Sequence, residues 1–148
     1  MYVVIPMLIA LALMLSASAP SDPGGRIAAA NRADGLAAIA LEFHQAAVAY
    51  IRANPATAGA LPALTLPTGW TASGLAACAS SKVVATYVTV PPEISAPAVA
   101  SSMSRQWGGW PLVGQASGNT LVSPYGASVT LPCPVPNGAP VIVSQAGS

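Results

Sequence analysis

Charged residues are scarce in this sequence. Five basic and four acidic residues make up 6% of the 148 residues, whereas about 25% is usual for a soluble domain. The net charge is +1, and Lys82 is the only lysine. Because no cluster of one sign is present, the composition excludes electrostatic steering toward nucleic acid or an anionic membrane surface. Small and neutral polar residues must form most of the surface, and we expect partner proteins to cover part of it.

Residues that support catalysis or metal binding are also few. His44 is the only histidine, and with two isolated cysteines it does not make the tetrahedral ligand set of a zinc site. Neither G-x-x-x-x-G-K-[ST] nor G-x-G-x-x-G occurs, so no nucleotide and no other cofactor is expected. His44 flanks the apolar stripe of a predicted helix, a place that favours a structural role. Asp34 and Glu42 fall on the solvated side of that helix. We therefore predict that the protein is not an enzyme.

The chain does have a long apolar start. Residues 2–15 carry no charge and are broken only by Pro6, and the small residues 17–19 follow. A cleaved signal peptide fits these small residues. An uncleaved anchor fits Pro20 better, because proline is poorly accommodated just after a cleavage site, and no Lys or Arg precedes the run. The span is short against the ~20 residues of a bilayer core, a mismatch that membranes absorb. Residues 1–19 are predicted to be a membrane anchor, or else a signal peptide.

Two cysteines, Cys78 and Cys133, stand far apart in the sequence. An isolated pair in an oxidising compartment often forms one disulfide, and closing this loop would stabilise the fold by ~4 kcal/mol on the chain-entropy model. The alternative is two buried thiols, which are common core residues. A disulfide would agree with export into the periplasm.

A hinge and a long helix are predicted next. Residues 20–27 contain two prolines and two adjacent glycines, which interrupt any continuous helix. From residue 28 to residue 53, apolar residues recur at steps of three and four, as in an amphipathic helix. The predicted apolar stripe consists of Leu36, Ile39, Ala40, Phe43, Ala47, Tyr50 and Ile51. Asn54-Pro55 ends this helix, because the residue before proline avoids the α region.

The remainder of the chain is rich in proline and reads as short strands. Residues 82–90 (KVVATYVTV) are dominated by β-branched and aromatic residues and predict a strand that Pro91-Pro92 stops. Residues 95–106 predict a short helix with Pro97 in its first turn. Further short strands are predicted at 111–116, 120–122, 128–131 and 141–144. The expected fold class is α+β: an N-terminal transmembrane helix, then a periplasmic domain over 28–148 in which the long helix packs on a small antiparallel sheet.

Three tryptophans are the candidate contact residues. Gly108-Gly109 separates Trp107 from Trp110, and Trp70 lies in a predicted loop. Each ring either caps the core or anchors a partner, because tryptophan is enriched at the centres of interfaces. We keep Trp70, Trp107 and Trp110 as candidate partner contacts.

Four stretches together resemble one family, the small PilM proteins of the thin pili of conjugative plasmids, which are type IV pili. Besides the N-terminal apolar segment, they are AVAYIRANPATAG (47–59), LPTGW (66–70), and LVSPYG with LPCPVPNGAPVIV (121–126, 131–143). The resemblance implies an inner-membrane protein of the pilin-transport apparatus or pilus basal body, with pilin or other pilus-assembly proteins as partners. The cytoplasmic, actin-like protein of the same name is much longer and binds nucleotide.

Two alternatives remain open. A pilin-like minor subunit shares the helix-then-sheet order, but a prepilin has a Gly before its apolar segment and typically a Glu near its start, and residues 1–4 offer neither. Its filament packing also prefers a helix without the break predicted at 20–25. The second alternative is a soluble periplasmic binding protein, released if cleavage follows Ala19.

Overall fold

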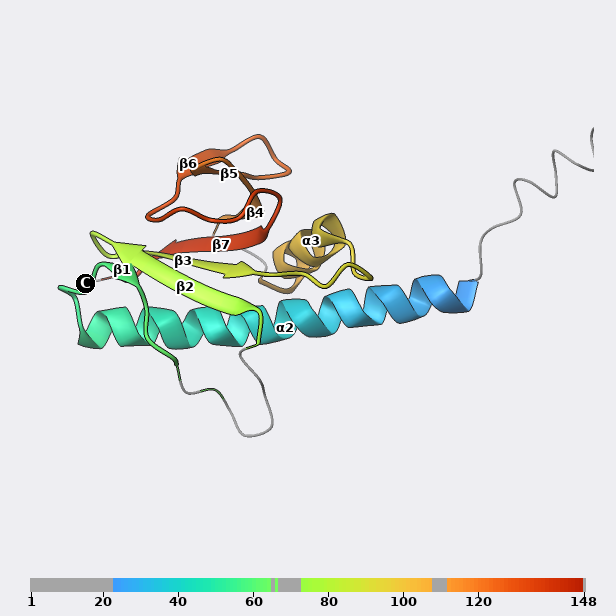
Figure 1. The fold of residues 1–148 in the computed structure, drawn as a ribbon, viewed down its shortest axis with the longest axis horizontal. Helices are drawn as coiled ribbons and strands as arrows, with labels where there is room; N and C mark the ends of the chain where they lie inside the picture. Colours follow the sequence, from blue (N-terminus) through green and yellow to red (C-terminus); the bar gives the residue numbers. More distant parts are fainter. Residues whose placement is uncertain (1–22, 65, 67–72, 108–111, 148) are drawn as a thin grey trace, which may run out of the picture.

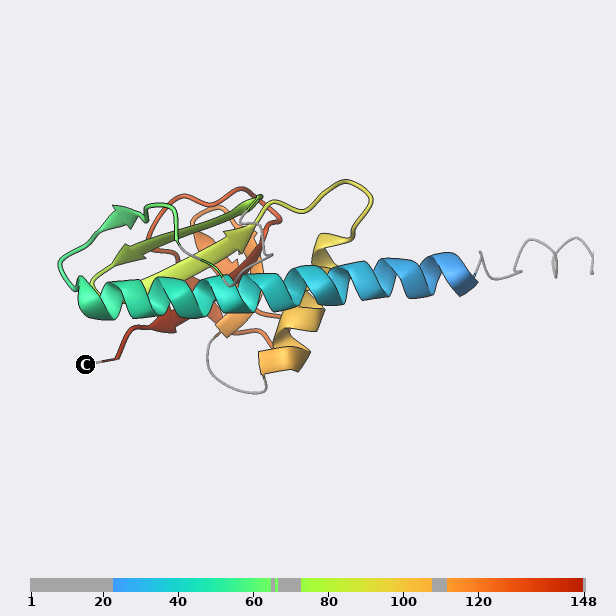
Figure 2. The same ribbon diagram turned by 90° about the horizontal axis from the view of Figure 1, so that it is seen from below.

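The computed structural model describes residues 23–64, 66, 73–107 and 112–147. Within these ranges a long helix, α2 (Pro23–Ala53), lies along one face of a seven-stranded antiparallel sheet, as Figure 1 shows. A shorter helix, α3 (Ala96–Trp107), packs against α2 and the sheet, and Figure 2 shows it crossing α2. The predicted α+β class, with a long helix on an antiparallel sheet, is confirmed.

The last strand of the chain, β7, lies at the centre of the sheet. Its order is β1-β2-β3-β7-β4-β5-β6, with every pair antiparallel. β7 therefore lies between β3 and β4, where Thr86 of β3 and Val113 of β4 both face Ile142. The strands are β1 (Gly59–Ala60), β2 (Leu75–Ser80), β3 (Val83–Val88), β4 (Leu112–Ser117), β5 (Thr120–Val122), β6 (Ser128–Thr130) and β7 (Pro140–Gln145).

Helix α2 begins earlier than the sequence predicted. It starts at Pro23 rather than at residue 28, so residues 23–27 of the predicted hinge are helical. A proline at the first helical position loses no hydrogen bond, because the first N–H groups of a helix have no intrahelical partner. The glycines at 24 and 25 fall in the same first turn. Residues 20–22 lie outside the described residues.

The buried stripe of α2 is built largely from alanine. Ala40 and Ala47 are fully buried, as are the larger Phe43 and Ile51, which the helical periodicity also predicted. Short side chains let a helix axis approach its neighbours closely. The predicted stripe residues Leu36, Ile39 and Tyr50 are only partly buried. The N-terminal end of α2 extends beyond the sheet (Figure 1), and residues 24–32 there are exposed.

Both faces of β2 and β3 are covered. On one face, Ala77, Ala79 and Val84 pack with Phe43 and Ile51 of α2. On the opposite face lies a second cluster that includes the following residues: Cys78, Ala85, Leu121, Leu131 and Val141. Because both faces of these strands contribute to the core, a chain of this size forms a core with few large side chains.

The β2–β3 hairpin was not predicted as a pair. β2 has the sequence LAACAS, in which alanine and serine have low strand propensity. The turn between β2 and β3 consists of Ser81 and Lys82, which have φ values of 51° and 67°. Both central residues of a tight two-residue hairpin adopt this left-handed conformation. The predicted strand at 82–90 corresponds to β3.

The membrane anchor predicted for residues 1–19 lies outside the described residues. Within the described ranges, neither helix combines the length and the apolar character needed to cross a bilayer.

Candidate functional site

His44 lies where α2 crosses the centre of the sheet. Its side chain is 1% exposed. Nδ1 is 2.9 Å from Oγ1 of Thr86 on β3, and Nε2 is 2.7 Å from Oγ of Ser144 on β7. The ring also lies edge-to-face with the ring of Trp107 at the end of α3, with the ring centroids 6.1 Å apart. One side chain therefore joins two helices and two strands.

Burial lowers the pKa of His44 from 6.5 to about 4, so the imidazole is neutral at pH 7. A neutral imidazole has one donor and one acceptor nitrogen, and a hydroxyl can take either role. Both nitrogens are therefore satisfied in either tautomer. The cause of the low pKa is the loss of hydration of the charged ring.

The contact between His44 and Ser144 has the geometry of a base and a nucleophile. A histidine with a pKa of about 4 is a weak base at neutral pH, however, and general bases work best with a pKa near the operating pH. The Nδ1 partner is the hydroxyl of Thr86, whereas a catalytic imidazole is usually oriented by a carboxylate. The arrangement fits a buried polar link between helix and sheet better than a catalytic pair.

A shallow cavity of about 440 Å³ opens beside this link. Arg52 supplies a positive charge, and the described lining contains no carboxylate. The lining residues are His44, Gln45, Val48, Arg52, Trp107, Ser144 and Gln145. Apart from His44 and Ser144, the described lining contributes one cation and otherwise neutral side chains.

Asp34 joins the two helices. Its Oδ1 accepts hydrogen bonds from Oγ of Ser102 and, at 3.1 Å, from Nη2 of Arg105 on α3. Nε2 of Gln106 donates at 3.0 Å both to the carbonyl oxygen of Asp34 and to Oγ of Ser102. The sequence placed Asp34 on a solvated face, and its side chain is 49% exposed, although it also contacts α3. α3 covers that side of α2, and nothing in the local pattern shows which helix packs there.

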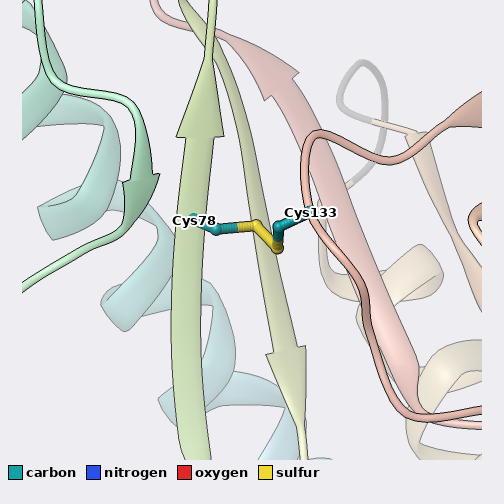
Figure 3. The surroundings of a disulfide bond; sticks show 2 residues. All are labelled: Cys78 and Cys133. Atoms are coloured by element: carbon teal, nitrogen blue, oxygen red, sulfur yellow. A yellow bond between two sulfur atoms is a disulfide. The ribbon is translucent and has the colours of Figure 1, made fainter.

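Cys78 and Cys133 form a disulfide (Figure 3). Cys78 is on β2, Cys133 is on the loop between β6 and β7, and their Cα atoms are 6.3 Å apart. The sequence had left this bond open against two buried thiols. The bond ties the long loop before β7 to the second strand of the sheet, across 55 residues of sequence.

Of the three tryptophans, Trp107 lies within the described residues. Trp107 is partly buried, packs against a core cluster and meets His44, so its ring contributes to the core. Trp70 and Trp110 lie outside the described residues. That these three residues contact a partner stays a prediction.

Two side chains of the polar link formed by His44, Thr86 and Ser144 were not predicted from the sequence. Thr86 fell in a predicted strand without a role, and Ser144, 100 residues from His44, carried no signal.

In the described part of the chain, no group of three or more His, Cys, Asp or Glu residues is placed to hold a metal ion.

Comparison with known proteins gives one line of evidence on identity. The family model PilM matches residues 7–143. Neither a curated protein nor a solved structure matches the chain. The match includes part of the apolar segment and nearly all of the folded domain, and it confirms the resemblance seen in the sequence. This chain belongs to the PilM family.

Proposed function

We propose that this protein is a non-enzymatic scaffold of type IV pilus biogenesis in the pilin-transport or basal-body apparatus. Residues 1–19 hold it in the bacterial inner membrane, and the rest lies in the periplasm. The observation that carries the proposal is the PilM match over residues 7–143, because membership of this family supports a role in pilus biogenesis.

The compartment is supported by the disulfide. Bonds such as Cys78–Cys133 persist in oxidising compartments, which include the bacterial periplasm. The anchor is supported by the N-terminal end of α2, whose exposed first turns extend beyond the sheet. The exposed turns over residues 24–32 span about 14 Å at 1.5 Å per residue, so they would separate the packed part of the domain from the end of the anchor by about that distance.

The non-enzymatic part of the proposal rests on chemistry. His44 is neutral, buried and weakly basic, as described above. With few charges to desolvate, the surface is suited to association, since charged residues are depleted from the buried centres of interfaces. The partners proposed are pilin or other pilus-assembly proteins, without nucleic acid or nucleotide.

The test is deletion and complementation in a host that assembles thin pili. Deletion is expected to abolish thin-pilus assembly and liquid mating, and the wild-type chain to restore both. Variant His44→Gln, if it is produced at the wild-type level, is also expected to complement, because a scaffold does not need a base. Normal thin pili after deletion would contradict the role in biogenesis, and a folded His44→Gln protein that fails to complement would contradict the non-enzymatic reading.

A pilin-like minor subunit is the second candidate, and one observation favours it. α2 runs without interruption from Pro23, so residues 23–25 of the break that argued against filament packing are helical. The two candidates separate on shearing: a subunit leaves the cell with sheared pili, whereas a scaffold stays with the inner membrane. Recovery of a tagged chain in the sheared pilus fraction would favour the subunit.

A further inference from the structure

The last third of the chain contains no charged residue. Arg105 is the final charge, and residues 106–148 have neither acidic nor basic side chains. These residues supply β4, β5, β6 and β7, and the first three of these strands form one end of the sheet, as Figure 1 shows. That end of the sheet is therefore neutral.

β6 is the outer strand of this neutral end. It pairs on one side with β5, and no described strand pairs with its other side. The N–H of Leu131 donates to Asn119 at 2.9 Å, and the N–H of Ser123 donates to Ala127 at 2.8 Å. Antiparallel ladders alternate in direction, so residues 127, 129 and 131 direct their backbone groups toward β5. The backbone groups of Ser128 and Thr130 consequently point outward.

Within β6 itself, this edge has no residue that blocks pairing. Natural edge strands are protected by shortness, lysine, proline or a bulge that keeps other strands away. Ser128, Val129 and Thr130 include no lysine, proline or bulge, so the pairing of β6 is limited by its shortness and by Pro132 beyond its end. Beside it are two of the exposed large apolar side chains of the described chain, Val122 at 47% and Tyr125 at 84% exposure.

We propose that β6 pairs with β6 of a second copy of this chain, antiparallel, about a two-fold axis at Val129. In this register Ser128 of each copy lies opposite Thr130 of the other. These are the residues whose backbone groups point outward, so each such pair exchanges both of its N–H···O bonds. The pairing ends at Pro132, because the next outward-facing position has no N–H to donate.

The absence of charge favours a second copy as the occupant. A two-fold axis places a surface against itself, so a charge near the axis faces an identical charge, and like charges directly opposite are destabilising. The strand and its flanks, from residue 106 to residue 148, carry no charge that would repel its own copy. The register also brings Tyr125 in the β5–β6 turn close to the loop that follows β6 in the other copy, which adds apolar area.

The test uses paired charge variants of the full chain in a mild non-ionic detergent. One variant is Ser128→Asp with Thr130→Asp, and the other is Ser128→Lys with Thr130→Lys. Both positions are exposed, so the core is unaffected. Sedimentation velocity is expected to show a concentration-dependent dimer for the wild type, loss of the dimer for each variant alone, and its return in an equimolar mixture of the two.

The matched control is Ala60→Asp on β1, the opposite edge of the same sheet, which is expected to remain dimeric. A wild-type chain that stays monomeric at every concentration overturns the proposal. Dimers that survive in both charge variants place the contact elsewhere, for example in residues 1–19, and also overturn it. So does a mixture that stays monomeric while both variants keep the Cys78–Cys133 disulfide and the wild-type circular dichroism spectrum.

Discussion

His44 gives the stability of this protein a defined dependence on pH. Its pKa is lowered from 6.5 to about 4 by burial. Between these two pH values the unfolded chain therefore binds a proton at His44 that the folded chain does not bind. The contribution is fully present above pH 6.5 and is lost as pH falls toward 4. The shift corresponds to about 3 kcal/mol.

We expect urea unfolding of the wild type to show this loss between pH 7.5 and pH 4.5. His44→Gln should unfold more readily at pH 7.5 but lose much less stability over the same interval, because the titrating group is gone. Glu42→Gln, at an exposed position of the same helix, is the control and should follow the wild type. Equal pH dependence in His44→Gln and the wild type would contradict the buried, neutral imidazole.

Gly114 on β4 is required by a close approach of the next strand. A Cβ at this position would lie 2.2 Å from the carbonyl oxygen of Val122 and 2.7 Å from its carbonyl carbon. Both are backbone atoms that cannot move aside cheaply. We expect Gly114→Ala to lower the free energy of unfolding by about 2 kcal/mol, a typical cost of overpacking.

Gly35 is the matched comparison, because a Cβ there meets nothing within 4 Å and the residue is helical. Gly35→Ala should therefore stabilise the fold by about 0.5–1 kcal/mol. Thermal unfolding of both variants checks the pair. A Gly114→Ala protein as stable as the wild type would show that β4 and β5 do not approach as described.

At the scale of elements, the disulfide is the main covalent constraint on the β6–β7 loop. It closes a span of 55 residues between β2 and that loop, for which the chain-entropy model gives about 4 kcal/mol. The double variant Cys78→Ala/Cys133→Ala should lose a large part of this stabilisation. Chemical denaturation measures the loss, and altered mobility of the wild type on reduction, absent in the variant, shows the bond. Identical mobility of the oxidised wild type and the variant would contradict it.

Elements with a strong local pattern were predictable from the sequence. α3 and β3 were expected within one or two residues of where they lie, because proline stops and β-branched runs are local signals. β2 was missed since its alanines favour a strand only when both faces are covered. The tertiary context that covers them, α2 on one side and the Cys133 loop on the other, is not visible in a six-residue segment.

Contacts between distant segments were beyond sequence reasoning. The insertion of β7 between β3 and β4 depends on pairing residues more than fifty positions apart. The same insertion brings Ser144 to His44 and thereby completes the polar link. The cysteine pair was the exception, because only one pairing exists for two cysteines.

At the scale of the whole molecule, charge is unevenly distributed along the chain. All charged residues lie between Asp22 and Arg105, and the strands formed after Arg105 present neutral surface. Low charge reduces the desolvation cost of association. This low charge is consistent with the proposed role in an assembly, to which membership of the PilM family also points.

Protease treatment of spheroplasts from cells that express a C-terminally tagged chain tests the anchored periplasmic scaffold most directly. We expect the tag to fractionate with the inner membrane, the protein to have its full-length mass, and added protease to remove the tag. A soluble protein lighter by residues 1–19 would contradict the anchored scaffold and indicate a released periplasmic protein. A membrane-bound tag that protease cannot reach would contradict the periplasmic placement.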